Sequence, residues 1–275
     1  MRPPAPYFGG KQRIADRIVA HFPPHLHYVE PYAGGLSVFL AKPQSQMETL
    51  NDIDGDLVTF WRILRDRPRE LRRACALTPH SRTELATAQL SLTGDDDLET
   101  ARRVWVLLSQ GRGAKTSTTG WRFYLDAART SGSFATSYLD GYLARILPAA
   151  ERLHAAQLEC RDALDVISDY GTKADTLIYV DPPYVLDSRG SARAQYKHET
   201  DDQHHRDLVA ALLACRAAVV LSGYQHPLYD ALRDWHQVHI AASTQQGNNG
   251  RNGRLEVLWI NRPDSSFLPD ESEAS

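Results

Sequence analysis

Cysteine is scarce in this chain: Cys75, Cys160 and Cys215 are the only three among 275 residues, and they stand far apart. Their odd number and wide spacing fit a reducing cytosol better than a disulfide framework, and no cysteine pair has the spacing of metal ligands. Apolar runs of about 18 residues are also missing, so no membrane span is expected. The first segment, MRPPAPYFGGKQR, lacks the apolar core of a signal peptide. The sequence therefore predicts a cytoplasmic protein.

A strong net charge of either sign is missing as well. The formal net charge is −3, which alone does not indicate a nucleic-acid-binding protein. Its distribution is uneven: residues 60–82 hold seven arginines against two acidic residues, and residues 101–145 hold six arginines and one lysine against two. A basic stretch of this kind usually forms a solvated helix face, and a nucleic-acid surface is the alternative.

Metal-ligand spacing is the third absence. The histidines of HLH (His25, His27) and of KHETDDQHH (His198, His204, His205) match no known type of zinc site. They are predicted to be surface histidines, and no metal is expected.

Strand-like and helical segments alternate at both ends of the chain. Strands are predicted in HYVE, METLND, QLEC, TLIYV, AAVVLSG, HQVHIA and LEVLWIN, and residues 68–156 are predicted to be mostly helical. This pattern predicts an α/β fold, a Rossmann-like sheet with helices on both faces and an inserted, mainly helical lobe. The predicted division is a core domain of residues 1–59 and 157–263, a lobe of residues 60–156, and a flexible acidic tail of residues 264–275.

The segment YVEPYAGGLSV is predicted to be a strand, a glycine turn and the start of a helix. Glycines let a backbone approach a ligand closely, although the dinucleotide spacing G-x-G-x-x-G is missing. Asp52 stands 22 residues after Glu30, where nucleoside-binding α/β folds place an acid on the ribose hydroxyls. Because no phosphate-binding Lys-Ser/Thr follows, a nucleoside without phosphate, such as S-adenosylmethionine, fits best. The alternative is that Asp52 and Asp54 cap the next helix.

The string Asp181-Pro182-Pro183-Tyr184 follows the apolar segment LIYV. Proline fixes φ and holds the preceding residue extended, so the Asp181 carboxylate and the Pro182 carbonyl can point to one spot. Two fixed acceptors suit an amino group with two N–H donors, and Tyr184 offers a flat face for a ring. The sequence predicts a grip for the exocyclic amino group of a nucleobase flipped out of its duplex. A rigid turn after a buried strand is the alternative.

Several motifs together resemble the DNA-adenine methyltransferases of the Dam type, which include phage and restriction-modification enzymes. PYFGGKQRI resembles the N-terminal cofactor motif of that family, VEPYAGGLSVFL its glycine motif, and LNDIDGDLV its ribose motif. CRDALDVI resembles the motif near the cofactor adenine, and DPPY is the catalytic motif. The segments YKHETDDQHHRDLVAAL, VVLSGY and RLEVLWIN are weaker echoes of later elements.

The resemblance implies an enzyme that transfers a methyl group from S-adenosylmethionine to the amino nitrogen of a flipped adenine in double-stranded DNA. The implied catalytic residues are Asp181, Pro182, Pro183 and Tyr184. The implied cofactor-binding residues are Tyr7, Lys11, Glu30, Pro31, Tyr32, Gly34, Asp52, Asp162 and Asp181. The resemblance further implies a bacterial or phage-infected bacterial cell and a cognate restriction endonuclease as partner.

Residues 60–156 depart from the Dam pattern. The hairpin with which Dam enzymes read GATC is not recognised here, so GATC specificity is not predicted. The segment GRGAKTSTTGWRFY carries Arg112, Lys115 and Arg122, which are predicted to contact DNA phosphates. A disordered basic loop is the alternative. Two other functions stay open: methylation of another amino group, in cytosine, RNA or a protein amide, and a catalytically inactive DNA-binding relative.

Overall fold

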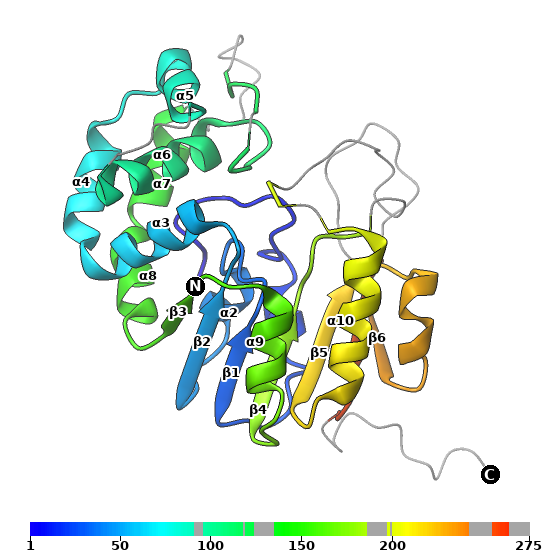
Figure 1. Ribbon diagram of the computed structural model, residues 1–275. Helices are drawn as coiled ribbons and strands as arrows, with labels where there is room; N and C mark the ends of the chain where they lie inside the picture. The colour runs from blue at the N-terminus through cyan, green and yellow to red at the C-terminus, as the bar shows by residue number, and fades with distance from the viewer. Residues whose placement is uncertain are drawn as a thin grey trace.

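A seven-stranded sheet forms the centre of the computed structural model, in the order β3-β2-β1-β4-β5-β7-β6 (Figure 1). The structure describes residues 1–90, 96–117, 119–123, 135–185, 197–198, 200–241 and 255–263. The strands are β1 His27–Glu30, β2 Met47–Asn51, β3 Gln157–Glu159, β4 Thr176–Val180, β5 Ala218–Gly223, β6 His236–Ala241 and β7 Leu255–Ile260. Neighbours from β3 to β5 are parallel, whereas β7 is antiparallel to both β5 and β6. The predicted α/β, Rossmann-like sheet is confirmed.

Helices cover both faces of this sheet, as the sequence predicts. The helices of the described residues are α1 Ala15–Val19, α2 Ser37–Ala41, α3 Gly55–Asp66, α4 Pro68–Leu77, α5 Arg82–Ala88, α6 Asp97–Gln110, α7 Ala135–Leu143, α8 Ile146–Leu153, α9 Ala163–Tyr170, α10 Asp202–Ala214 and the 3-10 helix η2 Pro227–Leu232. Helices α4 to α7 lie beside the sheet rather than on its faces (Figure 1). Strand β4 is buried on both sides because its side chains alternate between two cores. Leu177 and Tyr179 pack in a core with α1 and α2, and Ile178 and Val180 pack in a core with α9 and α10.

The helical middle of the chain lies between β2 and β3 (Figure 1). Phe60 of α3 and Trp105 of α6 are fully buried, and both belong to the same core as the α1 and α2 face of the sheet. The segment after β2 therefore packs as a continuation of one side of the sheet. The domain boundaries at residues 60 and 156 stay a prediction, and the acidic tail of residues 264–275 lies outside the described residues.

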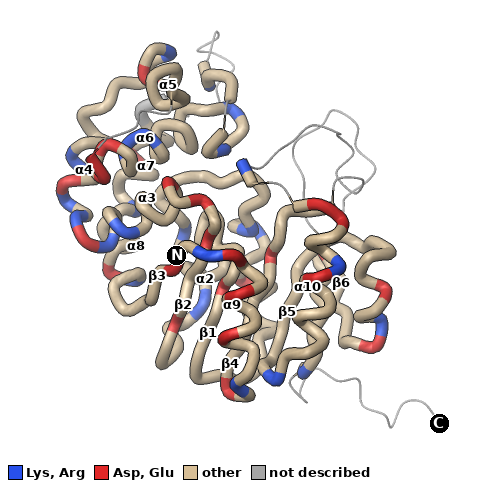
Figure 2. The backbone as a smooth tube through the Cα atoms, viewed as in Figure 1, with Lys and Arg blue, Asp and Glu red and all other residues tan. Residues whose placement is uncertain are grey.

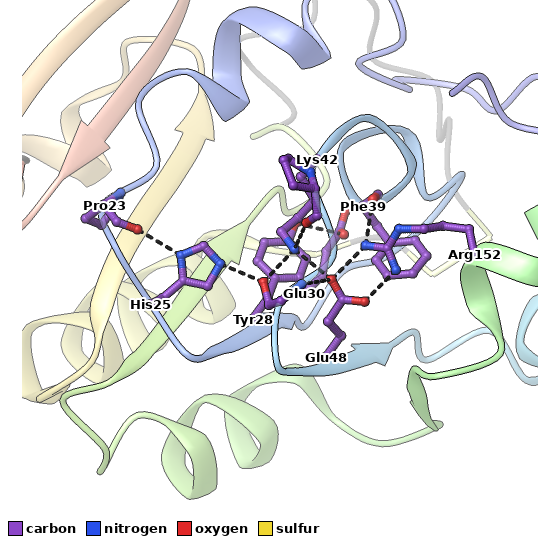
Figure 3. Close-up of polar contacts among 10 residues, drawn as sticks. Pro23, His25, Tyr28, Glu30, Phe39, Lys42, Glu48 and Arg152 are labelled. Carbon is purple, nitrogen blue, oxygen red and sulfur yellow. Dashed lines mark hydrogen bonds and ion pairs between the residues drawn. The ribbon is translucent and has the colours of Figure 1, made fainter.

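A buried ion cluster, here called the Glu48 cluster, joins this helical middle to the sheet (Figure 3). It consists of Lys42 after α2, Glu48 on β2 and Arg152 on α8. Glu48 is 1% exposed, and its carboxylate accepts hydrogen bonds from Lys42 Nζ at 2.7 Å and from Arg152 at 2.5 and 2.7 Å. The Arg152 guanidinium also lies over the Phe39 ring, 3.9 Å from its centroid. The cluster gives α8 a fixed attachment to β2.

Two of the histidines predicted to lie on the surface are buried, so that prediction is wrong for them. His205 on α10 is fully buried between Thr200 and Tyr229, with ring nitrogens 3.1 and 3.0 Å from their hydroxyl oxygens. His27 on β1 is 8% exposed, and its Nε2 lies 2.9 Å from Thr49 Oγ1. Hydroxyl partners satisfy the rings, which is why polar side chains are tolerated there. Within the described part of the chain, no helix has the length and apolar character needed to cross a membrane.

Candidate active site

The strand order reverses between β1 and β4, and a cavity of about 480 Å³ opens at the carboxyl ends of these strands. Open α/β sheets bind ligands at this switch point because the loops on either side of it diverge. The cavity is lined by Tyr7, Pro31, Tyr32, Gly34, Asp52, Ile53, Asp54, Asp162, Ala163, Asp181, Pro183, Lys197, His198, Thr200 and His204. Seven of the predicted cofactor residues therefore share one cavity: Tyr7, Pro31, Tyr32, Gly34, Asp52, Asp162 and Asp181.

The glycine turn after β1 is held against the N-terminal motif. Gly34 has φ +44°, and a Cβ on it would lie 2.9 Å from the ring of Tyr7; a Cβ on Gly35 would lie 2.5 Å from the Tyr7 Cβ. Both positions exclude a side chain because the Tyr7 ring packs on the backbone there. The N–H of Gly34 donates to Asp52 Oδ2 at 2.9 Å. The two glycine-containing motifs, far apart in the sequence, form one wall of the cavity.

Asp52 and Asp162 bring carboxylates to the cavity from two different strand ends. Asp52 Oδ1 accepts from the Asp54 N–H at 2.9 Å, while Asp54, not Asp52, is the N-cap of α3. Asp162 is the N-cap of α9 and accepts from the Leu164 N–H at 2.8 Å. Burial raises the pKa of Asp52 to about 6. Each carboxylate oxygen of Asp52 has a second lone pair, so the group can still accept hydrogen bonds from a diol.

The Asp-Pro-Pro-Tyr string begins directly after β4 and meets Lys11 from the N-terminal motif. Lys11 is 5% exposed. Its ammonium donates to Asp181 Oδ1 at 2.7 Å and to the Tyr184 hydroxyl at 2.6 Å. The Tyr184 hydroxyl in turn donates to Glu256 Oε2 on β7 at 2.9 Å, and Glu256 Oε1 lies 3.5 Å from Lys11 Nζ. Lys11, Asp181, Tyr184 and Glu256 are here called the Asp181 cluster.

Burial and the neighbouring charges set the protonation of the Asp181 cluster. Burial raises the pKa of Asp181 to about 6; the Lys11 ammonium lowers it and the Glu256 carboxylate raises it. Burial would lower the pKa of Lys11, but the charges of Asp181, Tyr184 and Glu256 outweigh it and raise that pKa well above its ordinary value. At neutral pH the cluster therefore holds an ammonium and an ionised Asp181 carboxylate.

The ring of Tyr184 is packed on a second aromatic ring. Tyr224, just after β5, stacks on it with centroids 4.2 Å apart and an interplanar angle of 15°. One ring face is thereby covered, so any stacked base must use the other. Pro182 is buried, whereas Pro183 lines the cavity. Asp181 thus projects into the cavity from a segment that is braced by Lys11 on one side and by Tyr224 on the other.

Lys11 and Glu30 line a second, smaller cavity of about 40 Å³, which shares Tyr7, Tyr32, Gly34 and Asp181 with the large one. Glu30 on β1 is 3% exposed and accepts a hydrogen bond from the Tyr28 hydroxyl at 3.0 Å. Burial raises the pKa of Glu30 to about 8. Lys11 thus contacts Asp181 from the side of the small cavity and is not among the residues that line the large one.

The residues predicted to contact DNA lie together at the start of the loop after α6. The Arg112 guanidinium lies 4.8 Å from the Phe123 centroid, and that of Arg122 lies 5.3 Å from the Tyr138 centroid. Lys115 Nζ lies 4.9 Å from the centroid of Phe8, beside the N-terminal motif. In the arginine-rich residues 60–82, which precede this loop, some arginines pair with acids, such as Arg67 with Glu70 at 2.7 Å. Figure 2 shows both signs of charge along α4. Residues 124–134 of the loop lie outside the described residues.

Several residues of the site are missing from the sequence-based prediction: Glu256, Ser222 and Tyr224 around Asp181, and Lys197, His198, Thr200 and His204 around the large cavity. Lys197 donates to Asp54 at 2.7 Å and to Asp56 at 2.8 Å. The one signal for Glu256 was its acidic side chain in the otherwise apolar strand LEVLWI. Among the residues with described positions, no group of three histidines, cysteines or acids is arranged to hold a metal.

Comparison with known proteins assigns the chain to a family. The model of the D12 class N6 adenine-specific DNA methyltransferases matches residues 7–229, which include the N-terminal motif, the glycine turn and the Asp-Pro-Pro-Tyr string. A similar protein is the Type II methyltransferase M1.LlaDCHI of Lactococcus lactis subsp. cremoris, 24% identical over 280 residues that cover 94% of each chain. The chain therefore belongs to the D12 class of N6 adenine-specific DNA methyltransferases and is a transferase that methylates adenine in DNA.

Proposed function

We propose that the large cavity binds S-adenosylmethionine and that Asp181 and the Pro182 carbonyl grip the amino group of the target adenine. The observation that carries this proposal is the position of Asp181, which follows β4 at the switch point and lines both cavities. A cavity of about 480 Å³ lies within the usual range of about 300–1,000 Å³ for small-molecule sites. Its lining combines carboxylates for ribose hydroxyls with Tyr32 and Ile53 for a flat base.

Asp52 is the proposed ribose ligand and Asp162 the proposed neighbour of the cofactor adenine. Asp52 is oriented by two backbone N–H groups, and that fixed orientation is what recognition of a diol requires. Tyr7, Glu30, Pro31, Tyr32 and Gly34 complete the proposed site. Lys11 supports it from below through Asp181.

When bound, S-adenosylmethionine supplies a methyl group activated by a positively charged sulfur. The two N–H groups of the adenine amino group donate hydrogen bonds to the Asp181 carboxylate and the Pro182 carbonyl, which frees the nitrogen lone pair for attack. Positive charge grows on that nitrogen during transfer, and the adjacent Asp181 carboxylate stabilises it. Tyr184 is proposed to stack on the base with the ring face opposite Tyr224. Positioning and electrostatics account for the acceleration, with no covalent enzyme intermediate.

The target is proposed to be an adenine flipped out of double-stranded DNA, with Arg112, Lys115 and Arg122 on the phosphates. These side chains follow α6, on the loop whose Ala114 carbonyl accepts from the Phe8 N–H at 2.8 Å. The contact joins the proposed DNA-binding loop directly to the cofactor motif. By its likeness to a Type II methyltransferase, the proposed setting is the cytoplasm of a bacterial or phage-infected cell, with a cognate restriction endonuclease as partner.

The experiment is sequencing that detects methylated bases in DNA from cells that express either the wild-type chain or Asp181→Ala. Wild-type cells are expected to carry N6-methyladenine in one sequence context, and cells with the variant are expected to lack it. Calorimetry with S-adenosylmethionine accompanies it, because the variant is expected to keep cofactor binding. Methylation at the wild-type level by Asp181→Ala would contradict the proposed mechanism, and methylated cytosine would contradict the adenine assignment.

A further inference from the structure

Strand β7 carries one charged side chain in a buried position, Glu256. The strand reads LEVLWI, and Glu256 is 2% exposed in the company of Val257, Leu258, Trp259 and Ile260. Burying a carboxylate in such surroundings is costly unless it is paired and hydrogen-bonded. An apolar residue would serve the packing of β7 better, so the acid needs a reason outside the strand.

The Glu256 side chain contacts β5, Lys11 and the Asp-Pro-Pro-Tyr string. Oε1 accepts from the Ser222 hydroxyl of β5 at 2.7 Å, which orients the carboxylate. Oε2 accepts from the Tyr184 hydroxyl at 2.9 Å, and Oε1 lies 3.5 Å from Lys11 Nζ. Glu256 thus contacts Tyr184 itself and Lys11, whose ammonium pairs with Asp181. It is not among the described residues that line the two cavities.

The charges explain what a second carboxylate adds. Lys11 alone with Asp181 would form a pair whose charges cancel, and the carboxylate would then stabilise a growing positive charge poorly. With Glu256 near the same ammonium, the buried group carries one negative charge in excess. Asp181 is the member of this buried group that lines the large cavity, so a ligand there meets a group with a net negative charge.

We propose that Glu256 is a positioning residue for methyl transfer, which shares the Lys11 ammonium and fixes the Tyr184 hydroxyl so that the Asp181 charge remains available to the amino group. This inference rests on the proposed roles of Asp181 and Tyr184. In the transfer, the amino nitrogen forms a bond to the methyl carbon as the carbon–sulfur bond breaks, and that electron pair stays on the sulfur. The nitrogen becomes positively charged and then loses one proton, which Asp181 accepts and passes to water.

The titratable groups near Asp181 come from five parts of the described chain. They are Lys11 of the N-terminal motif, Glu30 of β1, Tyr179 of β4 with Tyr184 after it, Tyr229 of η2, and Glu256 of β7. Glu256 is the acid among them that contacts the ammonium without lining a cavity. When the Glu256 charge is removed, Asp181 loses a neighbouring negative charge and keeps the Lys11 ammonium. The pKa of Asp181 is therefore expected to fall.

The test is Glu256→Gln, which keeps the shape and the hydrogen-bonding capacity of the side chain and removes its charge. Single-turnover methylation of a DNA duplex is measured from pH 5 to 9, with S-adenosylmethionine affinity measured by calorimetry. The expected result is a rate about 10- to 100-fold lower, typical of loss of a group that orients a reacting residue. The acid limb of the rate profile moves to lower pH, and the cofactor affinity stays within about twofold.

Glu48→Gln is the matched control, because Glu48 is as deeply buried as Glu256 and is also ion-paired, but it does not line the cavity. Its rate per folded molecule and its acid limb are expected to match the wild type. If Glu256→Gln does not fold, Ser222→Ala serves instead, with the same readouts and a smaller loss of rate.

A wild-type rate with an unmoved acid limb in Glu256→Gln would overturn the inference. Equal losses of rate and of cofactor affinity would overturn it as well, since they indicate a general structural role. Absence of adenine methylation by the wild-type chain in the same assay would instead contradict the proposed function, so the two failures are distinguishable.

Discussion

Two buried ion clusters in the described part of the chain have opposite compositions. The Glu48 cluster holds one carboxylate and two cations, Lys42 and Arg152, and its glutamate is 1% exposed. The Asp181 cluster holds two carboxylates around one cation, Lys11, and one of these carboxylates reaches a cavity. The excess charge is positive in the first cluster and negative in the second.

The pKa values follow this difference. Burial would raise the pKa of Glu48, but hydrogen bonds from Arg152 and Lys42 outweigh burial and hold that pKa below its ordinary value. Burial raises the pKa of Asp181 to about 6, because the Lys11 ammonium, which lowers that pKa, does not outweigh burial and the nearby Glu256 carboxylate. A fully paired carboxylate is a structural element, whereas an incompletely paired one next to a cavity has charge left for a ligand.

The largest expected effect comes from removal of the shared cation. Lys11→Met leaves two carboxylates facing each other, which raises the pKa of Asp181 further and releases its side chain. The single-turnover rate at neutral pH is expected to fall by roughly 10²- to 10³-fold, comparable to the loss of a main electrostatic contact in an active site. Rapid-quench methylation assays measure it.

Lys42→Met is the matched variant in the other cluster. It removes a buried lysine as well, but its rate per folded molecule is expected to stay at the wild-type value. A similar loss of rate in both variants would show that the two clusters do not differ in role.

Glu48→Gln is expected to lower the stability of the fold rather than the rate of methyl transfer. The change leaves Lys42 and Arg152 buried without their carboxylate, which is expected to lower the free energy of unfolding by roughly 3–5 kcal/mol. Urea denaturation followed by circular dichroism measures it. A change of less than about 1 kcal/mol would place this pair with weakly contributing surface ion pairs.

Features set by a few neighbouring residues could be predicted from the sequence, whereas contacts between distant segments could not. The apolar run TLIYV and the rigid Asp181-Pro182-Pro183 string are local features, so both β4 and the position of Asp181 at its end are predictable. Tyr7 and Asp52 were reached through motifs, and they line one cavity as those motifs imply.

The partners of Asp181 depend on topology instead. Lys11 lies 170 residues before Asp181 in the sequence. Glu256 lies near Asp181 only because β7 pairs between β5 and β6 in the sheet. A lone acid in an apolar strand signals a buried partner without saying which one. The two buried histidines, His27 and His205, were misjudged for the same reason, because their hydroxyl partners on neighbouring elements are not visible in a linear pattern.

Two variants of Tyr184 distinguish the role of its hydroxyl from the role of its ring. Tyr184→Phe keeps the stack on Tyr224 but loses the hydrogen bonds to Lys11 and Glu256, and a roughly 10-fold lower rate is expected. Tyr184→Ala also loses the stacked ring and is expected to weaken base capture by about 1–3 kcal/mol. Fluorescence of 2-aminopurine at the target position measures capture. Equal fluorescence from the two variants would contradict a stacking role.

The smallest expected effect is that of pH on the wild-type enzyme. Methyl transfer needs the Asp181 carboxylate ionised, so the rate is expected to fall about tenfold per pH unit below about 6, the raised pKa of this group. A rate that does not change between pH 5 and 8 would contradict this assignment.

Asp181 and Glu48 are expected to make the free energy of unfolding change with pH in opposite directions. The pKa of Asp181 is raised from 3.8 to about 6, so the folded state holds its proton more tightly, and this acid makes folding less favourable as pH rises through that window. The pKa of Glu48 is lowered from 4.5, so its contribution is present above that value and is lost as the pH falls below it. Unfolding of Asp181→Asn and Glu48→Gln across pH 3–7 measures both.

The most direct test of the central claim is the single-turnover rate of methylation by Asp181→Asn. Asparagine keeps the size of the side chain and one carbonyl acceptor, and it removes the negative charge. The account predicts a rate roughly 10²- to 10³-fold below wild type, with S-adenosylmethionine affinity retained. A rate within a few-fold of wild type would contradict it, because the Asp181 charge would then play no part in methyl transfer.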